Sequence, residues 1–100
     1  MRIPLLAAAL AASSFAAAAQ DMTVARGLAA GCAICHGTQG KVAPGAPLIA
    51  LAGLPRDYIA TQMRAFRDGK RPATVMHQIA KGYTDAQIDA MAAWYAAQPR

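Results

Sequence analysis

Acidic side chains are few in this sequence, and glutamate is absent. The five acidic residues are all aspartate, against ten lysines and arginines, and the formal net charge is +5. The sequence contains no run of Lys and Arg of the kind that forms a nucleic-acid-binding face, so no nucleic-acid partner is expected. The net positive charge fits better with electrostatic attraction of this protein toward an acidic surface on a partner protein.

Cysteine is equally scarce, with only Cys32 and Cys35 in the chain. A disulfide between residues so close in sequence would close a tiny loop and add little stability. A domain of this size buries only a marginal core and usually needs a covalent or metal staple. The staple is therefore expected to be something other than a disulfide.

Long apolar runs are also missing, apart from a stretch at the N-terminus. That stretch follows the positive start Met1-Arg2, is shorter than the roughly 20 residues needed to span a bilayer, and consists mostly of alanine. A charged start, an apolar middle and a small-residue end predict a secretory signal peptide over residues 1–19, cleaved near Ala19. We therefore expect one domain over residues 20–100, located in the periplasm, without stable membrane insertion after cleavage. An uncleaved membrane anchor is the alternative.

The remaining sequence carries helix signals and no strand pattern. One helix is expected from Asp21 to about Ala33, and a second from Pro55 to Asp68, where Gly69 stops it. A capping box over residues 84–87 opens the last helix, and a short helix is expected over His77–Lys81. The sequence thus predicts an all-α fold with three main helices.

A long irregular segment over residues 37–53 separates the first two helices and is rich in glycine and proline. Such a loop is unusual in so small a domain unless it wraps something, and a bound cofactor would explain it. The apolar stripes of the second and last helices, which are expected to be buried, are Ile59, Met63 and Phe66, then Ile88, Met91, Ala92 and Tyr95.

The motif that carries chemistry is Cys32-Ala33-Ile34-Cys35-His36. This C-x-x-C-H pattern is typical of covalent haem c attachment, because two thiols at this spacing reach the two vinyl groups of one porphyrin. His36 then becomes an axial ligand of the iron. A thioredoxin-like redox pair would need a βαβ context, and a zinc site would need His77 as a fourth ligand.

An iron with one protein ligand needs a sixth. Met63 and Met91 lie on helix stripes, and Met22 is too close to the motif to cross the porphyrin. Met76 lies in an irregular segment some forty residues after the motif, so the chain can fold over the far face of the ring. We therefore expect Met76 as the sixth ligand. His77, or an open position, remain the alternatives.

Three segments resemble class I c-type cytochromes of the c4/c553 group. The resemblance covers nearly all of residues 22–98, and its ligand segment is most similar to the cytochrome subunit of flavocytochrome c sulfide dehydrogenase. The segments are Cys32 to Gly40, Leu51 to Tyr58, and Met76 to Thr84 followed by Ala92 to Tyr95.

The resemblance implies a small class I cytochrome c fold, with three main helices around one covalently bound haem c. It implies electron transfer rather than catalysis, with a flavoprotein sulfide dehydrogenase subunit or another redox protein as partner. The alternatives are a free c553-type carrier to a terminal oxidase and a peroxidase-like enzyme with an open iron position. It also implies that the Pro47 carbonyl accepts a hydrogen bond from His36 Nδ1, and that Gly27 and Leu28 of the first helix meet Met91 and Trp94 of the last.

A group of basic residues follows residue 55. Steering toward an acidic partner makes them a candidate docking face, with Arg71 near a haem propionate. The alternative is an ordinary solvated surface. These residues are Arg56, Arg64, Arg67, Lys70, Arg71 and Lys81.

Overall fold

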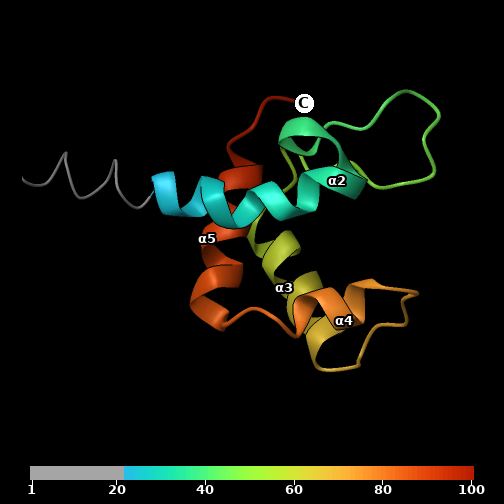
Figure 1. Ribbon diagram of the computed structural model, residues 1–100, viewed down its shortest axis with the longest axis vertical. Helices are drawn as coiled ribbons and strands as arrows, with labels where there is room; N and C mark the ends of the chain where they lie inside the picture. Colours follow the sequence, from blue (N-terminus) through green and yellow to red (C-terminus); the bar gives the residue numbers. More distant parts are fainter. Residues whose placement is uncertain (1–21) are drawn as a thin grey trace, which may run out of the picture.

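The computed structural model describes residues 22–100, which fold into helices joined by loops and contain no strand (Figure 1). This confirms the all-α prediction. The predicted signal peptide lies outside the described residues. In the described part of the chain, no helix has the length and apolar character needed to cross a bilayer.

The first helical segment runs further than the sequence predicts. Residues 22–29 are helical, and the path continues through η1 (Ala30–Cys32) and α2 (Ala33–His36). It ends at Gly37, whose φ of 85° and tight approach to the carbonyl of Lys41 exclude any side chain. Both cysteines and His36 therefore project from one helical end.

The second helix lies within one residue of its predicted bounds at each end, and the last helix begins where the sequence predicts. Helix α3 (Arg56–Arg67) follows Pro55 and ends before Gly69, which has a φ of 75°. Helix α5 (Asp85–Ala96) opens with the predicted capping box: Thr84 Oγ1 accepts from the Gln87 amide at 3.2 Å, and Gln87 Oε1 accepts from the Thr84 amide at 3.0 Å. The short helix α4 (Met76–Ala80) begins one residue earlier than expected.

The core lies where α5 meets α3 and the first helical segment. Ile59, Ile88 and Met91 are buried there, as the stripes predict. Tyr95 is 2% exposed, and its hydroxyl donates to the carbonyl of Ala29 at 2.6 Å. The first and last helices therefore meet at Ala29.

The first and last helices meet as predicted, but the predicted contact through Gly27 is wrong. A side chain on Gly27 would meet nothing within 4 Å, so this glycine is not a contact point between helices. Leu28 and Trp94 instead pack, partly buried, against the edge of the core. The edge of the Trp94 ring lies against the Tyr95 ring, with 5.0 Å between centroids.

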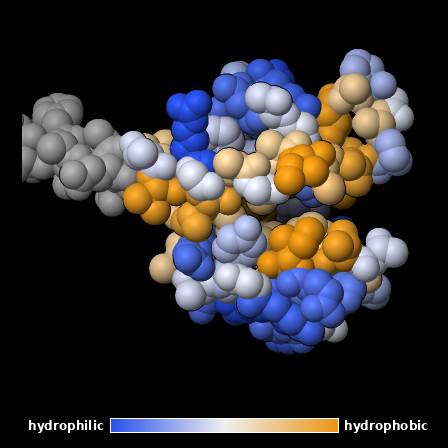
Figure 2. Space-filling view, in the orientation of Figure 1, coloured by the Kyte–Doolittle hydropathy of each residue, from blue (hydrophilic) through white to orange (hydrophobic). Residues whose placement is uncertain are grey.

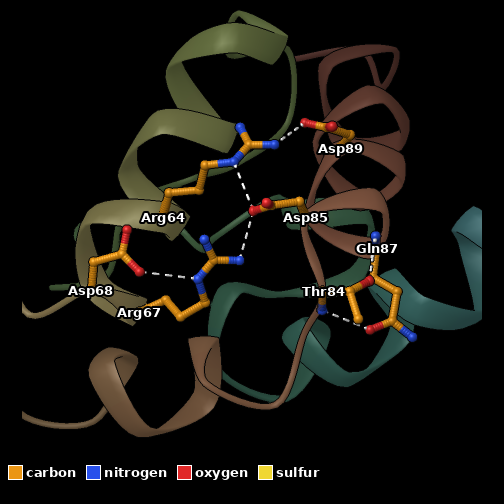
Figure 3. Close-up of polar contacts among 7 residues, drawn as sticks. All are labelled: Arg64, Arg67, Asp68, Thr84, Asp85, Gln87 and Asp89. Carbon is orange, nitrogen blue, oxygen red and sulfur yellow. Dashed lines mark hydrogen bonds and ion pairs between the residues drawn. The ribbon is translucent and has the colours of Figure 1, made fainter.

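Charged side chains join α3 to α5 on the outside of the molecule (Figure 3). Arg64 contacts Asp85 Oδ1 through Nε at 3.2 Å and Asp89 Oδ1 through Nη2 at 2.6 Å. Arg67 contacts the same Asp85 oxygen through Nη1 at 2.7 Å and Asp68 through Nε at 3.2 Å. The result is a network in which each arginine bridges two carboxylates.

This network alters the predicted basic face. Arg64 and Arg67 are neutralised by neighbouring aspartates, and Arg56 lies 3.6 Å from Asp57. Three of the six basic residues in the predicted docking face therefore form ion pairs within the fold. Unpaired positive charge for an outside partner has to come from other positions.

Asp85 makes the network sensitive to acid. The hydrogen bonds from Arg67, then from Arg64, hold the pKa of Asp85 below its ordinary value of 3.8. A carboxylate with a lowered folded-state pKa contributes stability above its unfolded pKa and loses it as pH falls through the folded value. We expect Asp85→Asn to lower the unfolding free energy at pH 7, with the difference from wild type shrinking below about pH 4.

Denaturant unfolding between pH 7 and pH 2 measures this difference. Asp57→Asn is the matched control, because Asp57 and its partner Arg56 are neighbours on α3 with exposed side chains. An Asp85→Asn deficit that stays constant down to pH 2 would contradict the assignment.

Candidate functional site

A cleft of about 370 Å³ opens between the α2 side of the molecule and the α3–α4 side. Figure 2 shows it as a groove with apolar surface on both banks, over the regions labelled α2 and α4 in Figure 1. Among the residues described, no carboxylate lines it, and its only cation is Arg71. Its lining comes from the C-x-x-C-H turn (Cys32, Cys35, His36), the loop at Pro47, Leu48, Ile49 and Leu51, helix α3 (Tyr58, Ile59, Gln62, Met63, Phe66), the loop over 71–75, and Met76, Ile79, Met91 and Tyr95.

The two cysteines stand on one wall as free thiols at different depths. Cys32 is partly buried and Cys35 is exposed. Burial raises the pKa of the Cys32 thiol above its ordinary value of 9.0, and a hydrogen bond with Tyr95 opposes this shift. Neither thiol is held in a disulfide, so both are available for thioether bonds.

The His36 ring lies on the same wall, where a hydrogen bond through Nδ1 orients it. Its Nδ1 lies 2.7 Å from the carbonyl oxygen of Ile49. A carbonyl can only accept, so Nδ1 carries the proton and Nε2 keeps a free lone pair. This is the tautomer and orientation that a metal-ligating histidine needs.

The family resemblance implied that Pro47 accepts this bond, and the structure corrects that expectation: Ile49 accepts the bond, and Pro47 lines the cleft. The loop is anchored where the amides of Leu51 and Ala52 donate to the carbonyl of Gly40, at 2.9 and 3.2 Å. That anchor sets which carbonyl reaches the imidazole. Every residue carries a backbone carbonyl, so no side-chain signal at Ile49 could have revealed it.

Met76 is the first residue of α4 and lines the cleft. Met63 and Met91 line it as well, so these two residues are not only core as predicted. His77 is absent from the lining, and its Nδ1 is buried without a hydrogen-bond partner. The described residues also contain no cluster of three or more potential metal-ligating side chains, which argues against the zinc alternative.

Arg71 is held at the edge of the cleft by two neighbours. Its guanidinium stacks over the Phe66 ring, 4.7 Å from the centroid, and donates to Gln62 Oε1. No carboxylate pairs with it among the described residues. The arrangement presents one fixed cation to a ligand that carries acid groups.

Together, these features define a c-type cytochrome. An apolar cleft, two free thiols three residues apart, an oriented imidazole and a thioether fit a covalently bound haem c. The comparison with known families agrees: the chain belongs to the family described as cytochrome c oxidase, cbb3-type, subunit III, which matches residues 19–94. It is an electron-transfer cytochrome c with haem c as its cofactor.

Relatives confirm the resemblance. The chain is 42% identical over 90 residues to the thiosulfate dehydrogenase electron acceptor of Thiomonas intermedia, 90% of this chain but only 42% of that protein. It is 39% identical over 80 residues to the cytochrome subunit of sulfide dehydrogenase of Chlorobaculum tepidum, covering 78% of this chain and 71% of the relative. It also matches cytochrome c-554(548) of Halomonas halodenitrificans at 38% identity, covering 83% of that protein.

A methionine substitution tests the ligand assignment. We expect Met76→Ala, in holoprotein, to abolish the Met–iron absorption band and to lower the reduction potential. Axial ligands help to set haem potentials over a range of about 0.8 V, and loss of the thioether removes the group that raises the potential. Visible spectroscopy and a redox titration measure both effects.

Met63→Ala is the matched control, because Met63 also lines the cleft. Its loss leaves a cavity and is expected to cost about 2 kcal/mol or more of stability while the Met–iron band persists. If Met63→Ala removed the band and Met76→Ala did not, the ligand would be Met63.

Proposed function

We propose that this protein is a periplasmic monohaem cytochrome that accepts single electrons from a dehydrogenase of reduced sulfur compounds, most directly the flavoprotein of a sulfide dehydrogenase. The observation that carries the haem electron-transfer role is the composition of the cleft. It brings together Cys32, Cys35, His36 and Met76, and no second histidine lines it in the described part of the chain.

The residue roles follow from this placement. Cys32 and Cys35 would hold the cofactor through thioether bonds, and His36 and Met76 would bind its iron. Haem iron, when bound, supplies a one-electron Fe(III)/Fe(II) couple. Arg71 would pair with a propionate and offset the cost of placing that acid group at an apolar cleft.

The remaining residues argue against other chemistry. Apolar side chains from α3 and α4 would keep water away from a bound haem iron, which would favour electron transfer over reaction with solvent. A peroxidase needs an open iron position and a polar distal base. His77, the residue able to act as that base, does not line the cleft. Residues 1–19 would act as the export signal, and 20–100 would form the mature domain.

The donor class rests on the relatives. Two of them are named for roles in sulfide and thiosulfate dehydrogenases. The chain spans less than half of the thiosulfate-linked relative but most of the sulfide-linked one, which favours sulfide dehydrogenase as the donor.

Reconstitution tests the donor. Oxidised holoprotein would be mixed with the catalytic part of the C. tepidum sulfide dehydrogenase and sulfide, and separately with a thiosulfate dehydrogenase and thiosulfate. We expect rapid haem reduction with the sulfide system, followed in the visible spectrum, and slower reduction or none with the thiosulfate system. The dehydrogenase without its substrate is the control.

A second experiment tests whether the complex with the dehydrogenase is permanent. Co-purification in about 1 M salt, where the Debye length is about 3 Å, indicates a stable subunit, because exposed charge pairs are screened there. If neither dehydrogenase reduces the haem and the cytochrome exchanges electrons rapidly with a terminal oxidase, the protein is a free carrier and the proposal is wrong. Rapid turnover of hydrogen peroxide would replace it with a peroxidase.

A further inference from the structure

The hydrogen bond that orients His36 joins two separate segments of the chain. His36, which carries the donor Nδ1, is the last residue of the helical path over residues 22–36. The acceptor, the carbonyl of Ile49, belongs to the loop over residues 41–52. The 2.7 Å between donor and acceptor therefore depends on how the loop is held relative to the helical path. A residue that contacts both segments is the one that can set this distance.

Tyr95 contacts the helical path from inside the core. It belongs to α5, which crosses that path in Figure 1, and it is 2% exposed. Its hydroxyl donates to the carbonyl of Ala29 at 2.6 Å. Burial raises the pKa of Tyr95 above its ordinary value of 10.0, and the neighbouring Cys32 thiol adds to this shift. The hydroxyl is therefore protonated at neutral pH, and its bond to Ala29 joins α5 to the helical path just before the haem attachment motif.

The same residue contacts the loop at both of its ends. At one end, a Cβ on Gly40 would lie 2.8 Å from Cδ1 and 2.9 Å from Cε1 of the Tyr95 ring, so the ring lies directly against the Gly40 backbone. At the other end, the amide of Gly53 donates to the carbonyl of Tyr95 at 3.0 Å. The loop that carries Ile49 therefore begins and ends on Tyr95.

Gly40 connects the ring contact to the hydrogen-bond acceptor. Its carbonyl accepts from the amide of Leu51 at 2.9 Å, and Leu51 lies two residues after Ile49. Of the three heavy atoms nearest to a Cβ on Gly40, two belong to the Tyr95 ring and the third to the Ala52 backbone. Without the ring, the Gly40 backbone is free to shift, and the Ile49 carbonyl shifts with it.

We infer that Tyr95 is a positioning residue for His36, because it holds the helical path and the loop at the separation that keeps the Ile49 carbonyl on Nδ1. This hydrogen bond raises the basicity of the imidazole, and a more basic axial ligand favours oxidised iron. Tyr95 would therefore lower the reduction potential of a bound haem through the His36 hydrogen bond. The effect on the potential rests on the proposed role of His36 as an iron ligand, and it is independent of the identity of the electron donor.

The test compares wild-type and Tyr95→Leu holoproteins in the reduced state. NMR measures how fast the His36 Nδ1 proton exchanges with solvent, and a redox titration measures the potential. Tyr95→Leu removes the ring and the hydroxyl, so exchange is expected to be about fivefold faster or more, the factor expected when one hydrogen bond is weakened. The potential should rise, because the imidazole becomes a weaker donor to the iron.

Tyr95→Phe separates the two contacts. It keeps the ring against Gly40 and removes the bond to Ala29, so its exchange rate should lie between those of wild type and Tyr95→Leu. A rate equal to that of wild type would show that the hydroxyl does not hold the helical path, and this comparison decides the inference even if Tyr95→Leu does not fold. A rate equal to that of Tyr95→Leu would show that the ring does not hold the loop. Either result would overturn the inference that Tyr95 holds both segments.

Ile88→Ala is the matched control. Ile88 is fully buried on the same helix and does not line the cleft. Its truncation leaves a cavity and lowers stability, but the exchange rate should stay within about twofold of wild type and the potential should not change. If Ile88→Ala accelerated exchange as much as Tyr95→Leu, the exchange would follow global stability and the positioning role would be wrong.

Failure of the proposed function gives a different result. An axial imidazole lies over the porphyrin, so its ring protons are shifted strongly upfield in the reduced protein. If the His36 ring protons of wild type lack this shift, the ligand assignment fails. The exchange rates of the Tyr95 variants then still decide whether Tyr95 sets the hydrogen bond between His36 and Ile49.

Discussion

The central constraint on this structure is an apolar cleft, which its largest apolar side chains line rather than fill. The buried apolar core of the described residues has ten members, and six of them are alanine. Such a core buries little area, and at about 25 cal/mol per Å² it contributes little against the cost of ordering the chain. The larger apolar side chains of α3 and α4 face the cleft. Bound haem would therefore complete the core as well as supply the chemistry, and its attachment at Cys32 and Cys35 would be the cross-link that a disulfide between them could not provide.

The same constraint explains how the backbone is shaped around the motif. The first helical path stops at Gly37, and the following loop returns through the Gly40 carbonyl to place Ile49 beside His36. The imidazole is thus oriented by protein groups alone. On the far side, α3 is tied to α5 by arginine–aspartate pairs, so the helix that carries Met63 and Phe66 is held from outside the cleft.

Local signals in the sequence were sufficient for much of the fold. Pro55 and Gly69 mark the ends of α3, and the Thr84–Gln87 box marks the start of α5, because capping is decided within a few residues. The position of Met76 on the cleft also agreed with its spacing from the motif. Contacts that depend on tertiary packing could not be predicted from the sequence. The neutralisation of Arg64 and Arg67 requires the packing of α3 on α5, and the choice of Ile49 over Pro47 depends on a backbone carbonyl that every residue has.

The claim that haem completes the core is tested most directly by comparing wild type with the Cys32→Ala/Cys35→Ala variant, both expressed in a host that attaches haem. Intact mass and denaturant unfolding are measured on the same samples. The account predicts that wild type carries the mass of one haem and unfolds cooperatively, and that the variant carries none and shows no cooperative transition. A bare polypeptide mass for wild type, or a variant without haem that unfolds as cooperatively as wild type, would contradict it.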